Sequence, residues 1–132
     1  MIKSIESLPL GNKKVFFQDP RNVAAAESYL RHALEALLDT GRHILVKGFA
    51  YPAVEYKDIA NGLSEKKILK QKESILLKKM AGYRNRMVHF YQEITPEELH
   101  EICFFHLDEI KLITNSVIEW LKSHSEMLNK DF

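Results

Sequence analysis

The chain has few of the residues that cross-link a polypeptide or break its helices. Its 132 residues include one cysteine, four prolines and five glycines. The single cysteine, Cys103, excludes an internal disulfide and a metal cluster built from cysteines, and it fits a reducing compartment. The low glycine and proline content argues against an architecture of short strands and turns.

Long apolar runs are also missing. No continuous apolar stretch is long enough to span a bilayer, and residues 1–6 lack the apolar run of a secretory signal peptide. We therefore expect a soluble, cytoplasmic protein with no membrane partner. Hydrophobic residues make up 45% of the chain, and no Pro/Gly/Ser-rich stretch divides it. We expect one domain over residues 1–132, with residues 1–18 as a short N-terminal extension.

Apolar residues recur at helical spacing through most of the chain. Asp19 followed by Pro20 predicts a helix start, and Gly48 predicts its end. Shorter apolar patterns predict helices over 53–63 and 70–91. Thr95 with Glu98 predicts a capping box that opens one last helix of more than twenty residues. The expected fold is all-α, an antiparallel bundle of about four to five helices.

Residues 81–91, Ala-Gly-Tyr-Arg-Asn-Arg-Met-Val-His-Phe-Tyr, combine a strong cation with a titratable imidazole. The guanidinium of Arg84 is a planar fork of donors that suits phosphate. His89 can accept and donate a proton near neutral pH. A proton shuttle beside a clamp on developing charge is the minimum needed to break a phosphodiester without a metal.

The pattern Arg84-Asn85-x-x-x-His89-x-Tyr91 resembles the signature of HEPN-domain proteins, in the form found in HepT-like ribonuclease toxins. The resemblance implies a HEPN-like bundle and a homodimer with facing motifs. It also implies a metal-independent endoribonuclease toxin of a type II/VII toxin–antitoxin pair, which needs no cofactor. In this family pattern Arg84 and His89 would be catalytic in transesterification through the RNA 2′-hydroxyl, and Asn85 would support them. The N-terminal segment departs from the family pattern, because it is shorter and less helical than a typical opening helix of these proteins.

The resemblance also implies a partner. In HepT-like toxins the tyrosine of the motif, here Tyr91, is adenylylated by a minimal nucleotidyltransferase (MNT) antitoxin. Bulk and negative charge at Tyr91 would oppose RNA. The pattern Leu-Leu-Asp39-x-x-x-His43-Ile is similar to the first long helix of these proteins, so Asp39 and His43 are candidate supporting residues.

Charge is unevenly distributed around the motif, although the net charge is only +1. Residues 65–86 contain eight Lys or Arg and two acids, whereas residues 93–109 contain six acids and no Lys or Arg. The basic block predicts an approach path for RNA, with Lys78, Lys79 and Arg86 as candidate contacts. The alternative is a solvated helix face. On an ideal helix Arg84 and His89 would lie about 140° apart, flanking a groove.

Each candidate also has a structural explanation. Arg84 can pair with a glutamate of the last helix, His89 can be a cap or core residue, and Tyr91 can be a core tyrosine. The chief rival function is therefore a non-catalytic helical subunit that binds a nucleotidyltransferase or nucleic acid. A metal site is a weaker rival that rests on a polar stripe formed by His32, Glu35, Asp39 and His43. The stripe is about 16 Å long, which is too long for one ion to bind all four side chains.

Overall fold

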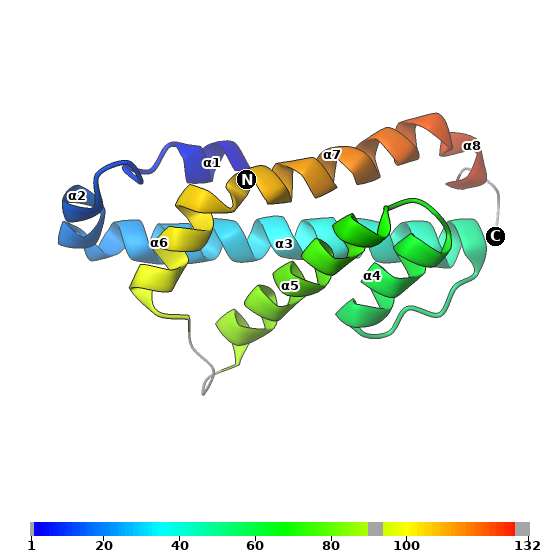
Figure 1. Ribbon diagram of the computed structural model, residues 1–132, viewed down its shortest axis with the longest axis horizontal. Coiled ribbons are helices and arrows are strands. Elements are labelled where there is room, and N and C mark those ends of the chain that lie inside the picture. The colour runs from blue at the N-terminus through cyan, green and yellow to red at the C-terminus, as the bar shows by residue number, and fades with distance from the viewer. Residues whose placement is uncertain (1, 90–93, 129–132) are drawn as a thin grey trace.

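The longest helix, α3 (Pro20–Phe49), is the axis against which the other helices pack (Figure 1). The computed structural model describes residues 2–89 and 94–128. Within these residues the structure is all-helical, as predicted, and contains no strand. The remaining helices are α1 (Ile2–Glu6), α2 (Lys13–Gln18), α4 (Tyr56–Glu65), α5 (Gln71–Val88), α6 (Pro96–Phe105), α7 (Leu107–Ser123) and α8 (Ser125–Leu128).

Local capping signals set where α3 and α6 begin. The side chain of Asp19 accepts a hydrogen bond from the backbone N–H of Arg21, and that of Thr95 accepts one from Glu98 at 3.1 Å. A proline follows each cap, where its missing N–H is not needed. The predicted starts of both helices are confirmed.

The predicted end of α3 was wrong. The helix continues through Gly48 to Phe49 and ends at Ala50, which adopts a left-handed conformation with φ 50°. The backbone N–H groups of Ala50 and Tyr51 bond the carbonyls of Val46 and Leu45 at 3.1 and 2.9 Å. These bonds satisfy the last-turn carbonyls without a glycine.

The predicted last helix is two helices, α6 and α7, separated at His106. The backbone of His106 (φ −113°, ψ 6°) leaves the helical conformation, and its imidazole lies 3.0 Å from the carboxylate of Glu109. The predicted capping box at the start of α6 was also wrong in one of its two bonds, the one from the Glu98 side chain back to the backbone of Thr95. The carboxylate of Glu98 is bound by Arg86 at 2.7 and 2.8 Å instead.

One hydrophobic cluster joins residues of α1 to α7. Ile5 of α1 and Phe16 of α2 have no exposed surface, so the N-terminal segment contributes to this core. Figure 1 shows α7 running alongside α3, while α5 crosses α3 obliquely. None of the helices that the structure describes has both the length and the apolar character needed to span a bilayer.

Burial makes Cys103 on α6 chemically inert. Its side chain is 1% exposed, and desolvation raises the pKa of the thiol to about 12. We expect a thiol-specific reagent to leave the native protein unlabelled at neutral pH and to label it fully in denaturant, since reactivity requires the thiolate. Rapid labelling of the native protein, measured by intact mass, would contradict this burial.

Candidate functional site

An open groove of about 530 Å³ lies where the loop before α4 and the start of α4 face α5. Four of the predicted site residues line it, namely Lys78, Arg84, Asn85 and His89. The groove is also lined by Arg42, Val54, Glu55, Tyr56, Lys57, Ala81 and Gly82. Its cations come from three helices, so the fold gathers charge that is dispersed along the sequence.

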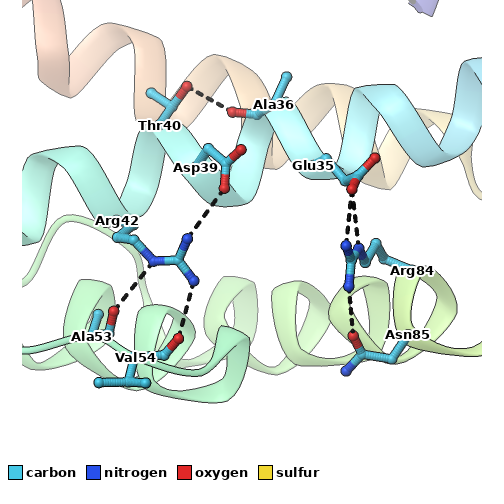
Figure 2. A network of polar contacts seen from close by, with 9 residues as sticks. All are labelled: Glu35, Ala36, Asp39, Thr40, Arg42, Ala53, Val54, Arg84 and Asn85. Carbon is cyan, nitrogen blue, oxygen red and sulfur yellow. Dashed lines mark hydrogen bonds and ion pairs between the residues drawn. The ribbon is translucent and has the colours of Figure 1, made fainter. Parts of the chain in front are cut away.

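An ion pair between α3 and α5 holds Arg84 in place (Figure 2). Its Nε and Nη2 atoms donate to one carboxylate oxygen of Glu35 at 3.3 and 2.9 Å. Arg31, one turn earlier on α3, donates to the other oxygen at 3.1 Å. These bonds hold the pKa of Glu35 below its usual value of 4.5, chiefly through Arg84. The partner of Arg84 therefore comes from the first long helix, and not from the last helix.

Asn85 and Tyr56 complete the surroundings of the guanidinium. The Oδ1 atom of Asn85 accepts from Arg84 Nη1 at 3.4 Å. The Cζ atom of Arg84 lies 4.9 Å from the ring centroid of Tyr56, in cation–π contact. Asn85 therefore contacts the arginine. These contacts leave N–H donors on both Nη atoms for an incoming anion.

Arg42 of α3 forms a second anchored cation beside the first (Figure 2). Its guanidinium lies 3.4 Å from the carboxylate of Asp39 and donates to the carbonyls of Ala53 and Val54 at 3.3 and 3.1 Å. It also lies 5.5 Å from the centroid of the Tyr56 ring. Arg42 thereby fixes the loop before α4. Asp39 is not among the residues that line the groove, but it contacts Arg42, which does line it.

His89 lies just outside α5, which ends at Val88 rather than at the predicted residue 91. Its backbone is extended (φ −92°, ψ 115°), and its N–H caps the helix by donating to the carbonyl of Asn85 at 3.0 Å. The residue is exposed. The angle expected on an ideal helix does not apply to an extended residue. His89 lines both the groove and a neighbouring hollow, which also contains Val23, Glu27, Met87, Val88, Ile94, Pro96 and Leu99.

Three other predicted residues, Lys79, Arg86 and His43, are not among the residues that line the groove. The guanidinium of Arg86 binds Glu98 of α6, and the ammonium of Lys79 lies 5.9 Å from the centroid of the Tyr83 ring. His43 is exposed on α3 and is not among the residues that line the groove. Tyr91 lies outside the described residues, so its position relative to Arg84 stays a prediction.

Two further histidines, His100 and His32 of the polar stripe, have structural partners. His100 of α6 is 2% exposed, with Nε2 2.7 Å from the carbonyl of Leu10, and His32 lies 3.4 Å from the Ser28 hydroxyl. Across residues 2–89 and 94–128, no three His, Cys, Asp or Glu side chains are grouped closely enough to hold a metal ion. The polar stripe on α3 therefore does not form a metal site within these residues.

Sequence reasoning missed the roles of Glu35, Arg42 and Tyr56. A signal existed for the first two, because Glu35, Asp39 and Arg42 are spaced at i, i+4 and i+7 and so share one face of α3. The polar stripe drawn from the sequence contains Glu35 and Asp39 but not Arg42. The position of Tyr56 depends on how α4 packs against α3 and α5, which no local pattern specifies.

The Glu35–Arg84 pair predicts a pH-dependent contribution to stability. Because the pKa of Glu35 is lowered in the folded protein, the stabilisation is present above the ordinary pKa of 4.5 and is lost as the pH falls through the folded value. We expect Glu35→Gln to lower the free energy of unfolding by about 1 kcal/mol at pH 7. The difference from the unmodified protein should shrink below pH 4.5. Urea titrations of both proteins, from pH 7 to below pH 4.5, measure this difference in the free energy of unfolding.

The matched control is Glu119→Gln, which changes an exposed carboxylate of α7. It should leave the free energy of unfolding nearly unchanged throughout. A stability difference for Glu35→Gln that stays constant down to acid pH would show that the carboxylate is not bound as described.

Comparison with known proteins assigns the chain to a family. A family model described as Ribonuclease HepT-like matches residues 1–117, and the match includes the N-terminal segment. Among solved structures, a chain from a crystal structure of a toxin–antitoxin with AMP-PNP is similar, with 25% identity, a TM-score of 0.77 and 89% of each chain covered. No curated protein matches. The sequence motif and the fold agree with this match, and the chain belongs to the HepT-like ribonuclease family.

Proposed function

We propose that this protein is an endoribonuclease toxin that cleaves RNA without a metal ion. The observation that carries the proposal is that Arg84 and His89 line one exposed groove. Lys78, Lys57 and Arg42 line the same groove and supply positive charge for a polyanion. Membership in the HepT-like ribonuclease family supports this activity. We further propose that the whole chain acts as a single domain, since its core includes residues from α1 to α7.

In the proposed reaction His89 accepts the proton of a ribose 2′-hydroxyl. The 2′-oxygen then forms a bond to phosphorus, and the bond from phosphorus to the 5′-oxygen breaks. A protonated imidazole returns a proton to the leaving 5′-oxygen, which yields a 2′,3′-cyclic phosphate and a 5′-hydroxyl. Arg84 stabilises the charge that builds on the phosphoryl oxygens. Glu35, Tyr56 and Asn85 hold the guanidinium in place, so it need not reorganise during the reaction.

We propose that the active form is a homodimer. His89 lies between the polar groove and a hollow lined mainly by apolar side chains, among them Met87, Val88 and Leu99. Val88 is 44% exposed, and Val54, on the groove, is 78% exposed. A second copy that covers this apolar surface would bring two His89 side chains near one another. One imidazole would then act as base and the other as acid.

We also propose a toxin–antitoxin pair in which a minimal nucleotidyltransferase adenylylates Tyr91. A solved relative at 25% identity is part of a toxin–antitoxin that contains AMP-PNP, which supports a nucleotide-binding partner for this chain. Tyr91 follows His89 by two residues. An adenylate at Tyr91 would therefore introduce negative charge near the imidazole and oppose the RNA phosphates.

The Glu35–Arg84 pair favours a second candidate function. A guanidinium that joins α3 to α5 has a structural role of its own, which fits a non-catalytic subunit that binds a nucleotidyltransferase or nucleic acid. The two candidates differ in whether the unmodified protein cleaves RNA.

Cleavage of RNA in excess chelator is the decisive experiment. We expect the unmodified protein to cleave, and His89→Ala to lower the rate by about 10²- to 10⁴-fold because it removes the proton shuttle. Arg84→Ala should lower it by about 10²- to 10³-fold through lost charge stabilisation. RNA with 2′-deoxyribose at the cleavage position should resist. Gel separation of labelled products measures the cleavage rate of each variant and of the deoxyribose substrate, and end-group analysis identifies the cyclic phosphate.

His124→Ala is the matched control, since His124 is an exposed histidine beyond the end of α7. It should cleave like the unmodified protein. No cleavage by the pure unmodified protein would favour the non-catalytic subunit. Cleavage that chelator abolishes would instead require a metal.

The proposed inhibition has its own test. Incubation with ATP and a nucleotidyltransferase encoded beside this protein should add adenylate to Tyr91 and suppress cleavage. Tyr91→Phe should prevent the mass increase and keep the protein active in the same mixture, because it lacks the acceptor hydroxyl. Peptide mass spectrometry locates the modification. An adenylate found on another residue, or inhibition of Tyr91→Phe without modification, would contradict this mechanism.

A further inference from the structure

The groove extends beyond the residues that the reaction requires. Toward the start of α5 it is lined by Lys78, and toward α4 by Lys57. Glu55 is the one acid among the lining residues, and it lies 3.2 Å from the ammonium of Lys57 in an exposed pair that water and salt weaken. This end of the groove therefore has an excess of positive charge that the cleavage step itself does not use.

Lys78 is set apart from the reacting groups along the helix. Lys78 and Arg84 are six residues apart on α5, a rise of about 9 Å, and helical side chains all lean toward the N-terminus. Their charged ends therefore stay separated along the axis. Lys78 suits a phosphate neighbouring the one at Arg84, and not the same phosphate.

Gly82 leaves the helix surface open between Lys78 and Asn85, the residue that contacts Arg84. Lys78, Gly82 and Asn85 are spaced at i, i+4 and i+7, so they follow one face of α5, and His89 comes directly after the end of the helix. Gly82 is exposed, and a Cβ built there would meet no atom within 4 Å. Internal packing thus gives no reason for a glycine, which destabilises a helix interior relative to alanine.

We propose that the groove contains a second phosphate subsite for single-stranded RNA. The scissile phosphate lies at Arg84 and His89, a neighbouring phosphate binds Lys78, and the ribose–phosphate backbone passes directly over Gly82. The absence of a side chain at Gly82 lets the backbone approach the helix closely. The inference rests on the proposed ribonuclease function and adds that the preferred substrate extends beyond a single phosphodiester.

Binding of an uncleavable probe tests the subsite without depending on catalysis. The probe is a short fluorescein-labelled RNA with methylated 2′-hydroxyls, and fluorescence anisotropy gives its affinity at several salt concentrations. We expect Lys78→Ala to weaken binding several-fold and to reduce the slope of log affinity against log salt by about 0.7. Lys122→Ala, an exposed lysine of α7, should change neither. Unchanged affinity and slope for Lys78→Ala would overturn the subsite.

Substitutions at Gly82 separate a binding role from a structural one. Gly82→Ala should raise Tm by about 4 °C because it favours the helix, yet weaken probe binding. Gly82→Leu, also a good helix former, should stay folded by circular dichroism and weaken binding more than tenfold. The close approach would be overturned if Gly82→Ala is more stable and both variants bind the probe as tightly as the unmodified protein does.

Cleavage assays distinguish failure of this inference from failure of the proposed function. Lys78→Ala should raise the KM for a longer RNA much more than the KM for a dinucleotide with one phosphodiester, because only the longer RNA has a phosphate for Lys78 to bind. RNA cleavage that depends on His89 but not on Lys78 or Gly82 would overturn the subsite alone. Probe binding that depends on Lys78 and Gly82, without cleavage of any RNA, would support the subsite and overturn the ribonuclease function.

Discussion

The ion pair between Glu35 and Arg84 solves the main physical difficulty of this groove, which is that it gathers several cations in a small space. Like charges close together repel, and the fold must offset that repulsion from the protein side. Glu35 does so for Arg84 and Asp39 does so for Arg42, both from α3. The charge of each arginine is thus offset by a carboxylate of α3, while N–H donors of Arg84 remain available to a ligand. Removing Glu35 would leave a half-buried guanidinium among other cations, oriented only by Asn85 and the ring of Tyr56 among its described contacts.

Close packing of α4 on α3 gives the groove its second wall. A Cβ at Gly41 of α3 would lie 2.9 Å from the Cγ2 of Ile59, and one at Gly62 of α4 would lie 2.8 Å from Leu45. Neither helix could approach the other this closely with larger residues at these positions. The approach places Tyr56, at the start of α4, where both Arg42 and Arg84 contact its ring. One aromatic ring therefore gives a cation–π contact to both guanidinium groups.

Sequence reasoning succeeded where the determinant is local and failed where it is tertiary. The caps at Asp19 and Thr95 were predictable because a side chain bonds its own first turn. The break at His106 was not, because the apolar stripe continues in phase across it and only the backbone changes direction. Arg84 and His89 were found from their spacing, but the partner of Arg84 lies 49 residues away in the sequence. Spacing also could not show that His89 leaves the helix, since a helix end depends on which carbonyls find partners.

The arrangement divides attraction and catalysis between different residues. An arginine tied to a carboxylate contributes little net charge at long range, so Arg84 is poorly suited to attracting RNA from solution. It is well suited to stabilising a transition state, because its direction is fixed before the substrate arrives. Lys78 is an exposed point charge on a flexible stem, and the pair of Lys57 with Glu55 is exposed and weakened by water and salt, so these lysines have the opposite properties. A groove that needs both functions gains from keeping them on separate side chains, since the contacts that orient a cation also weaken its field.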